Sequence, residues 1–202
     1  MGESSPREMV EVLRRASERL LAATYLYAAA SYLVWLVVLS FYMLAVLPLA
    51  QGLGGAASAV VNLAYWLGLG LAVYGAVARW FWGYIRRLGA SSTGSGCERI
   101  MAGWLAVPAL ILVLAWLLEP VAGDAAAPLA LTLALAYGSL VNSLAERCGG
   151  ERAPVSLAAV ALLLAAGVPG SLYLGWPGFS YAVVLSYSVT AMLYLVKAMK
   201  SF

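Results

Sequence analysis

The sequence predicts an all-α integral membrane protein, a six-transmembrane-helix bundle with both termini in the cytoplasm and an N-terminal cytoplasmic amphipathic helix. The 202-residue chain is 64% hydrophobic and only 10% charged, whereas a soluble domain is about a quarter charged. Its 12 Lys and Arg are confined to the two terminal segments, to two of the connections between apolar runs, and to the adjoining helix ends. Because basic residues are retained on the cytoplasmic side during insertion, this confinement predicts the orientation.

Residues 1–19 are predicted to form a cytoplasmic amphipathic lead-in helix. Ser5 and Glu8 have the spacing of a capping box, and Pro6 suits the first helical position. Apolar residues follow at helical spacing, at Val10, Leu13, Ala16 and Leu20. We expect this helix to lie along the inner membrane surface or to run straight into the first span. A docking helix for a cytoplasmic partner is the alternative.

Residues 20–202 are predicted to form the transmembrane domain. Its spans are expected at about 20–50, 57–81, 101–118, 128–144, 155–174 and 179–196. As a helix the 31-residue first run would be about 46 Å long. The hydrocarbon core is only ~30 Å thick, so this span is expected to tilt or to rest one end in the interface.

The fifth span is predicted to be broken. Its uninterrupted run, 155–168, is followed by Pro169 and Gly170, and as a helix it would reach only about 21 Å. Proline removes a helix donor and clashes with the preceding turn. Broken backbone at membrane depth is tolerated only when it is buried in protein or lines a wet cavity, and many transporters hold their substrates there. We therefore predict a ligand site in the outer half of the bundle. A kinked helix end with an outer aromatic belt is the alternative.

Five residues are the candidates for ligand binding: Tyr173, Trp176, Tyr181, Tyr187 and Asn142. The first three would supply amphipathic walls, and Tyr187 a polar group deeper in the bundle. Asn142 is the most costly side chain of the spans to leave unpaired in lipid. For Asn142 the preferred alternative is packing through an interhelical hydrogen bond.

Several kinds of chemistry are excluded or disfavoured. The chain has no His, which excludes His-ligated haem, His acid–base catalysis and His-containing metal sites. No Asp or Glu lies inside a predicted span, where proton relays and ion-coupled transporters place carboxylates. We therefore predict no enzymatic activity, no catalytic residue, no cofactor and no metal. Nucleic-acid binding is not expected either, because the cations are spread over separate helix ends.

The two cysteines, Cys97 and Cys148, fall in connections that are predicted to be cytoplasmic. A reducing cytosol argues against a disulfide, with hyperthermophiles as the exception. With Glu98 and Glu146 beside them, the two thiols make a mirrored pair whose groups could ligate a soft metal. The spacing fits no compact site, however, and ordinary loop residues explain it.

The size, six spans and inner termini are similar to those of the substrate-binding subunits of energy-coupling-factor vitamin transporters. Ala22, Ala23 and Ala28–Ala30 give the first span an Ala-rich face, which this resemblance implies is a docking face. An amphipathic helix before six spans also resembles the membrane half of an exporter-type ABC permease, although this chain is short for that group and lacks a clear coupling-helix signature. No ligand motif matches, so the resemblance is one of layout.

We expect a non-enzymatic multi-pass protein of the cell membrane. It is expected to bind or translocate a small uncharged or amphipathic solute, either alone or as a subunit of a larger transporter. Its partners are expected to be the lipid bilayer and either a cytoplasmic or membrane partner subunit or a second copy. The alternative is a structural or assembly subunit of a membrane complex, without a ligand site of its own. A polar or aromatic cavity open to the outside would distinguish the two.

Overall fold

The computed structural model describes residues 6–70, 72, 75–76, 79, 100, 102–148 and 150–201, and nearly all of them are helical. Within the described residues, four segments are long and apolar enough to cross a membrane: Arg7–Leu53, Ala102–Cys148, Leu157–Leu174 and Trp176–Lys200. The predicted helical class is therefore confirmed for the described residues, and the apolar helices are compatible with a multi-pass membrane location. The predicted second span, 57–81, lies partly outside the described residues.

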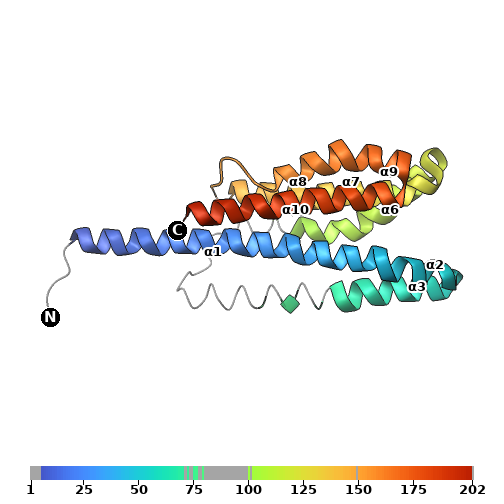
Figure 1. The fold of residues 1–202 in the computed structure, drawn as a ribbon, viewed down its shortest axis with the longest axis horizontal. Helices are drawn as coiled ribbons and strands as arrows, with labels where there is room; N and C mark the ends of the chain where they lie inside the picture. Colours follow the sequence, from blue (N-terminus) through green and yellow to red (C-terminus); the bar gives the residue numbers. More distant parts are fainter. Residues whose placement is uncertain are drawn as a thin grey trace.

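Helix α1, Pro6–Phe41, runs unbroken from the predicted lead-in segment into the first span. It continues through a π-helical turn, Tyr42–Val46, into α2, Leu47–Leu53. No Gly or Pro occurs in α1 after Pro6, so neither residue type interrupts or kinks this helix. Figure 1 shows that the N-terminal part of α1 extends well past the other helices. Of the two expected placements, the structure therefore shows the helix running straight into the span.

Glycines with positive φ reverse the chain at three places at one end of the bundle. They are Gly54 and Gly55, with φ of 67° and 49°, Gly123, with φ of 52°, and Gly175, with φ of 62°. Gly54 separates α2 from α3, Gly55–Ala64, which continues into a π-helical segment, Tyr65–Gly70. We call this end of the bundle the turn end (right in Figure 1). The opposite end, where Arg147, Lys197 and Lys200 lie in the last turns of their helices, is called the charged end.

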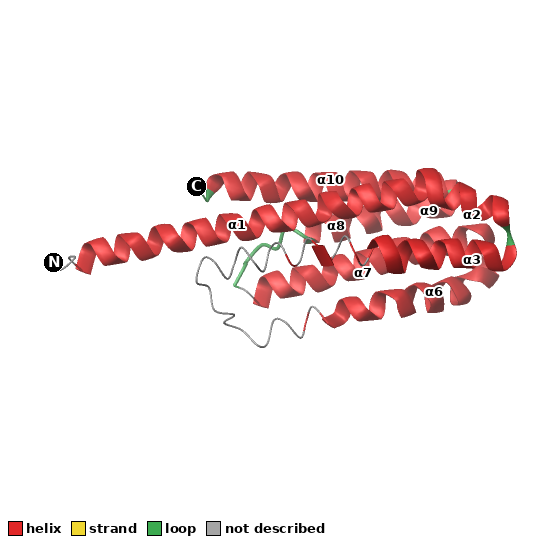
Figure 2. Ribbon diagram, turned by 90° about the horizontal axis from the view of Figure 1, so that it is seen from below, coloured by secondary structure: helices red, strands yellow, loops and turns green. Residues whose placement is uncertain are grey.

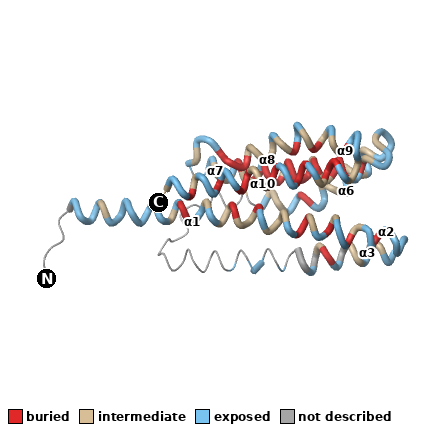
Figure 3. Tube along the Cα trace, viewed as in Figure 1, coloured by how far each residue is buried: buried red, intermediate tan, exposed pale blue. Residues whose placement is uncertain are grey.

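Helices α6 and α7 form a hairpin that turns at Gly123. Helix α6 spans Val107–Ala122, preceded by a 3-10 turn at Ala102–Ala106, and α7 spans Ala126–Cys148 after a 3-10 turn at Gly123–Ala125. Among the described elements α6 packs mainly on α7. Half of its large apolar side chains are exposed, namely Leu112, Val113, Trp116, Leu117 and Val121. Helix α6 is thus peripheral, whereas α7 is buried along most of its length (Figure 3).

The predicted break at Pro169 is not found. Helix α8, Leu157–Leu162, a π-helical turn, Leu163–Gly167, and α9, Val168–Leu174, follow one another without interruption. Pro169 stands in the first turn of α9, directly after the π-helical turn, and such local adjustments re-satisfy backbone groups that proline frees in a membrane.

Helix α9 is also closed against α10, Trp176–Lys200. A Cβ added to Gly178 would overlap the carbonyl group of Gly170, and a Cβ on Gly170 would lie 3.0 Å from the Gly178 carbonyl oxygen. The two backbones are therefore in direct contact where a wet cavity was expected.

The core lies where α1, α7 and α10 meet, with α8 and α9 alongside. Helices α1 and α10 lie side by side along the bundle in both views (Figures 1 and 2). Ala22 and Ala29 are almost completely buried, and small residues of this kind let helices approach closely in lipid. The Ala-rich face predicted to dock a partner is thus used in part within the chain.

Candidate functional site

Helix α7 carries a line of polar side chains along its buried face. Thr132, Ser139 and Glu146 are spaced seven residues apart, and Asn142 and Ser143 lie between the last two. The hydroxyl-bearing residues among them are at most 1% exposed. The 14 residue steps from Thr132 to Glu146 correspond to about 21 Å of helix, a large part of a ~30 Å hydrocarbon core. We call these side chains and the groups that meet them the polar file: Thr132, Ser139, Asn142, Ser143 and Glu146 with Tyr32, Ser156, Ser171, Tyr187, Thr190 and Tyr194.

Glu146 forms the end of the polar file nearest the charged end of the bundle. Its carboxylate accepts the Val155 N–H at 2.7 Å, together with the hydroxyls of Ser156 and Tyr194. The Ser143 and Ser156 hydroxyl oxygens are 2.8 Å apart. One carboxylate therefore ties together α7, α10 and the connection that leads into α8.

Four tyrosines of α1 and α10 pack their rings together beside this line. Tyr25 and Tyr32 are seven residues apart on α1, and Tyr187 and Tyr194 are seven apart on α10, so they interleave between the packed helices. The Tyr32 ring meets that of Tyr187 edge-on at 5.1 Å and stacks on that of Tyr194 at 5.8 Å. The Tyr25 and Tyr194 rings are 6.4 Å apart. Such pairs are each worth about 0.5–1.5 kcal/mol beyond their burial.

The middle of the polar file holds two buried hydroxyls that make no hydrogen bond, those of Ser139 and Thr190. Ser139 lies next to the side chains of Tyr32 and Tyr187. Thr190 stands on α10 between Tyr187 and Tyr194 and is fully buried. A buried polar group without a partner costs about 1–3 kcal/mol. The middle of the file therefore has hydrogen-bonding capacity that the fold does not use.

The polar file ends toward the turn end at a second hydroxyl pair. The Thr132 and Ser171 oxygens are 2.8 Å apart, and the Thr132 hydroxyl donates to the Pro128 carbonyl at 2.9 Å. Leu135 follows Thr132 on α7, Phe179 and Val183 precede Tyr187 on α10, and all three are buried in the same apolar core cluster as the tyrosines. In this conformation an apolar layer therefore closes the file.

A charged rim surrounds the Glu146 end. Glu151 accepts the Tyr25 hydroxyl at 2.5 Å and pairs with Lys197 at 2.9 Å. Lys197 also donates to the Ala153 carbonyl at 3.1 Å and lies 5.3 Å from the centre of the Tyr25 ring. The hydrogen bond from Tyr25, and then that from Lys197, hold the pKa of Glu151 below its usual value.

The structure separates the five predicted ligand-binding residues into two groups. Tyr187 and Asn142 belong to the polar file, and both contact Tyr32, since Asn142 donates to the Tyr32 hydroxyl at 3.4 Å. Tyr173 and Tyr181 are 86% and 79% exposed, so their side chains face away from the core. Trp176 is half-buried and meets Phe179 edge-on at 5.9 Å. Their role in ligand binding stays a prediction.

Asn142 also has the packing role that was weighed for it. It accepts the indole N–H of Trp104 at 2.8 Å. The Trp104 ring lies where a Cβ of Gly138 would be, so a glycine on α7 makes room for the indole. This contact fastens the segment before α6 to α7.

Sequence reasoning missed Glu146, because the basic Arg147 beside it suggested a connection after a span ending at 144. In the structure α7 continues to Cys148, and the Glu146 carboxylate turns into the bundle. The signal that indicates this is the seven-residue spacing of polar side chains in an otherwise apolar helix, which places them on one face. The matching spacing of the tyrosines on α1 and α10 is the second signal.

No metal centre is found in the described part of the chain, which holds no group of three or more His, Cys, Asp or Glu side chains able to bind an ion. Cys148 takes part in a disulfide, so the expectation of free thiols is wrong for this residue. That expectation rested on the redox state of the compartment, and intracellular disulfides do occur in hyperthermophiles. Cys97 and Glu98, the other half of the mirrored pair, lie outside the described residues.

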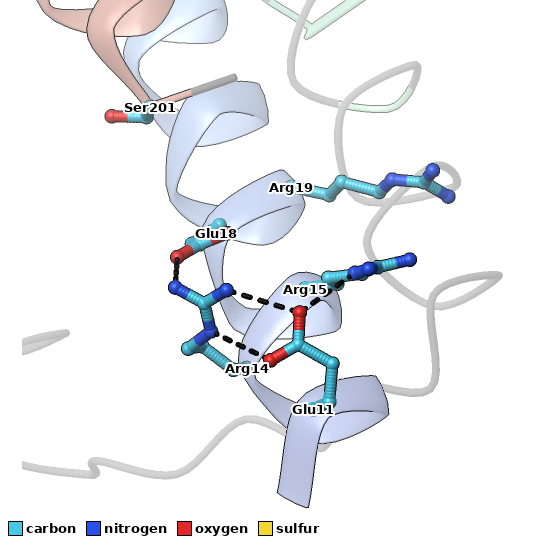
Figure 4. Close-up of a pocket in the computed structure, with 6 residues that line it drawn as sticks. All are labelled: Glu11, Arg14, Arg15, Glu18, Arg19 and Ser201. Atoms are coloured by element: carbon cyan, nitrogen blue, oxygen red, sulfur yellow. Dashed lines mark hydrogen bonds and ion pairs between the residues drawn. The ribbon is translucent and has the colours of Figure 1, made fainter. Parts of the chain in front are cut away.

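A surface hollow of about 350 Å³ lies on the extended N-terminal part of α1 (Figure 4). It is lined by Glu11, Arg14, Arg15, Glu18, Arg19 and Ser201. Four of its charged side chains are already paired along the helix, with Arg14 bound to Glu11 at 3.0 Å and to Glu18 at 3.4 Å, and Arg15 bound to Glu11 at 3.0 Å. Exposed pairs of this kind contribute little, and we do not regard the hollow as the functional site.

The chain matches no protein-family model, no curated protein and no solved structure. No similarity of sequence or fold therefore supports the two resemblances of layout. The geometry of the polar file is what remains to indicate a function.

Proposed function

We propose that this chain is a non-enzymatic membrane protein that binds or passes a small uncharged or amphipathic solute along the polar file. The observation that carries the proposal is the pair of buried, unpaired hydroxyls of Ser139 and Thr190. Polar side chains in spans usually join helices by hydrogen bonds. An unpaired hydroxyl adds nothing to packing and calls for another explanation, which a hydrogen-bonding solute supplies.

The composition of the polar file supports this class of solute. Its middle offers hydroxyls and one amide, which both donate and accept hydrogen bonds, and its charge lies at one end on Glu146. The buried rings of Tyr32, Tyr187 and Tyr194 offer apolar surface to the rest of such a molecule. Passage across the bundle requires the layer of Leu135, Phe179 and Val183 to open.

The solute proposal is tested by light-scattering measurements of liposome swelling with glycerol, urea and propanediol as probes. We expect vesicles with the protein to swell faster than protein-free vesicles for at least one probe. Ser139→Val and Tyr187→Phe should change that rate at least threefold. Met192→Leu is the matched control, because Met192 is on the same helix but exposed. Equal rates with and without protein for every probe would refute the proposal.

We further propose six spans with both termini cytoplasmic, which makes the charged end the cytoplasmic end. The confinement of the basic residues supports this orientation, and Arg147, Arg152, Lys197 and Lys200 all belong to the charged end. In a cysteine-free background, a membrane-impermeant reagent outside sealed vesicles should label Glu119→Cys but not Arg152→Cys. The reverse labelling pattern would invert the topology.

A structural or assembly subunit remains the second candidate function, and the extended part of α1 favours it. Met9, Val10, Val12 and Leu13 are exposed there, beyond the other helices (Figure 1). Under this reading, deleting residues 1–19 removes a stoichiometric partner from the protein purified from its native membrane, while the swelling rates equal those of protein-free vesicles. Swelling that survives the deletion assigns the solute function instead.

A further inference from the structure

Between α7 and α8, residues 150–156 form the longest stretch without helix in the described part of the chain. We call them the strap. Residues 154–156 are buried in the bundle end, where Val155 belongs to the core and Ser156 to the polar file. We propose that the strap is a displaceable closure over the charged end of the polar file, and that the charged rim is its latch. Closure against a solute rests on the proposed function, whereas movement of the strap does not.

The strap supplies hydrogen-bond partners to two polar side chains of α7. The Ser156 hydroxyl donates to the Glu146 carboxylate, and its oxygen lies 2.8 Å from that of Ser143. The Val155 N–H donates to the same carboxylate at 2.7 Å. With the strap in place, Ser143 is only 1% exposed. If the strap moves away, water can take over each of these hydrogen bonds. Opening therefore uncovers groups that water satisfies, and leaves no polar atom of the strap contacts unpaired.

Side chains of α1 and α10 fasten the strap at the rim. Lys197 on α10 pairs with Glu151 at 2.9 Å and donates to the Ala153 carbonyl at 3.1 Å. Tyr25 on α1 donates to Glu151 at 2.5 Å. The Lys197 and Glu151 side chains are 30% and 23% exposed, and solvent and salt weaken ion pairs that they reach. These contacts can therefore open while the helices stay packed.

The main chain of the strap is held at its beginning and not beyond it. The Gly150 and Glu151 N–H groups donate to the Arg147 and Glu146 carbonyls, each at 3.0 Å, and so complete the end of α7. Gly150 has a φ of 94° there, which glycine adopts without strain. From residue 152 to residue 155, no main-chain N–H donates to a main-chain carbonyl among the described residues. This part of the strap can therefore swing out without unwinding α7.

Hydrogen exchange of the full chain in lipid nanodiscs, resolved to single residues, tests the movement of the strap. The Val155 N–H reports it, because its acceptor lies on α7. We expect this N–H to exchange at least about tenfold faster than the main-chain N–H groups in the middle of α7, because the strap opens locally. Tyr25→Phe should speed its exchange at least threefold further and leave α7 unchanged. Tyr42→Phe, the same substitution on the same helical rod, is the matched control and should change neither.

Two results of the exchange experiment would overturn the proposal. If the Val155 N–H exchanges no faster than α7, the strap opens only when the bundle unfolds. If Tyr25→Phe speeds exchange at Val155 and in α7 alike, Tyr25 stabilises the whole bundle and is not a latch. Glu151→Gln, which removes the ion pair with Lys197, gives a second reading of the latch and keeps the test valid if Tyr25→Phe fails to fold.

Access to the polar file is tested with Ser143→Cys and a small water-soluble methanethiosulfonate reagent. The thiol should react slowly under the closed strap, and the unsubstituted protein gives the background. Adding Tyr25→Phe should raise the rate of modification at least threefold, whereas adding Tyr42→Phe should leave it unchanged. If Tyr25→Phe speeds exchange at Val155 but not the modification of Ser143→Cys, the strap moves without uncovering the file, and closure is refuted.

The swelling assay tests closure against a solute. Tyr25→Phe should raise the swelling rate at least threefold, and Tyr42→Phe should not. If the wild-type protein passes a solute at a rate that Tyr25→Phe does not change, the strap is no barrier to that solute, and the proposed function stands without it. If neither protein passes any of the probes, the proposed function fails, and hydrogen exchange and thiol modification alone decide whether the strap closes the file.

Discussion

Two clusters of tyrosines line the same helix, and they differ in how their polar atoms are paired. Tyr42, ten residues after Tyr32 on the same helical rod, packs with Tyr65 and Trp66 at ring distances of 5.6 and 5.0 Å. Its hydroxyl donates to Asn62 at 2.7 Å, and Tyr65 donates to the Val38 carbonyl at 2.6 Å. We call this group the Tyr42 cluster. Every hydroxyl in it has a partner, and none of its members is charged.

The polar file contains the same residue types, but its polar atoms are paired differently. It adds a carboxylate, and it leaves the hydroxyls of Ser139 and Thr190 unpaired. The Tyr42 cluster therefore behaves as interhelical glue, the ordinary role of polar groups in spans. The comparison teaches that the number of hydroxyls does not mark a site in a membrane bundle. A site is marked instead by buried hydroxyls that have no hydrogen-bond partner and lie near a charged group.

The largest expected difference between the two clusters is in stability. Glu146→Ala should lower the free energy of unfolding by about 2–4 kcal/mol, because three donors lose their charged acceptor. Tyr42→Phe should cost only about 0.6 kcal/mol, a typical interhelical hydrogen bond in a membrane. Both are measured by titration with denaturing detergent in mixed micelles. Glu119→Ala is the control, and equal losses for Glu146 and Tyr42 would erase the distinction.

Double-mutant cycles sharpen the comparison at the level of single bonds. The coupling free energy between Tyr194 and Glu146, from Tyr194→Phe and Glu146→Gln, should be about 1.5–3 kcal/mol, since the acceptor is charged. The coupling between Tyr42 and Asn62, from Tyr42→Phe and Asn62→Leu, should be about 0.5–1.5 kcal/mol, as for a neutral pair. A larger value for the neutral pair contradicts the assignment of the charge to the polar file.

The unpaired hydroxyls should give an effect of opposite sign. Thr190→Val keeps the shape of the side chain and removes an unpaired hydroxyl, so the unfolding free energy should rise by up to about 1 kcal/mol. Thr132→Val removes a paired hydroxyl, and should lower it by about 1 kcal/mol. Thermal unfolding in detergent measures both. Destabilisation by Thr190→Val would mean that the polar file is as fully paired as the Tyr42 cluster.

The smallest expected effect is a dependence on pH at the rim of the polar file. The pKa of Glu151 in the folded protein is held below its usual value, first by Tyr25 and then by Lys197. Its stabilisation is therefore present above the unfolded-state pKa, about 4.3, and is lost as the pH falls through the folded-state pKa.

Glu151→Gln should remove that part of the acid sensitivity, by no more than about 1 kcal/mol because the pair is partly exposed. Urea or detergent unfolding at several acidic pH values measures it. Tyr42→Phe should leave the acid dependence of stability unchanged. An equal change in both variants would show that this dependence does not come from Glu151 at the rim.

The sequence predicts the helices better than the site. Apolar runs and their glycine and proline boundaries predict the helical class, and the capping pattern around Pro6 predicts the helix that opens the chain. Pro169 was misread because a π-helical turn, Leu163–Gly167, is set by packing and has no sequence signature. That packing includes Gly167 against Thr132 and Gly170 against Gly178.

The polar file was only partly predictable, for a different physical reason. Asn142 and Tyr187 stand out as polar groups in apolar runs, and both belong to it. Glu146 does not stand out, because a charge near a helix end is ordinarily solvated. Its burial depends on donors from α10 and from the connection into α8, which are distant in sequence. Only the three-dimensional packing brings those donors to it.

The unbroken course of α1 gives the molecule a mechanical property. After Pro6 it contains no glycine or proline up to its end at Phe41, and these residues are usual places where helices bend sharply. An axial push or a twist applied to the extended end would therefore reach Tyr25 and Tyr32 with little loss. Tyr25 holds the rim through Glu151, and Tyr32 stacks in the middle of the bundle. The helix is therefore a stiff rod. Its N-terminal part extends outside the bundle, and a movement of that part would be transmitted to the tyrosines inside it.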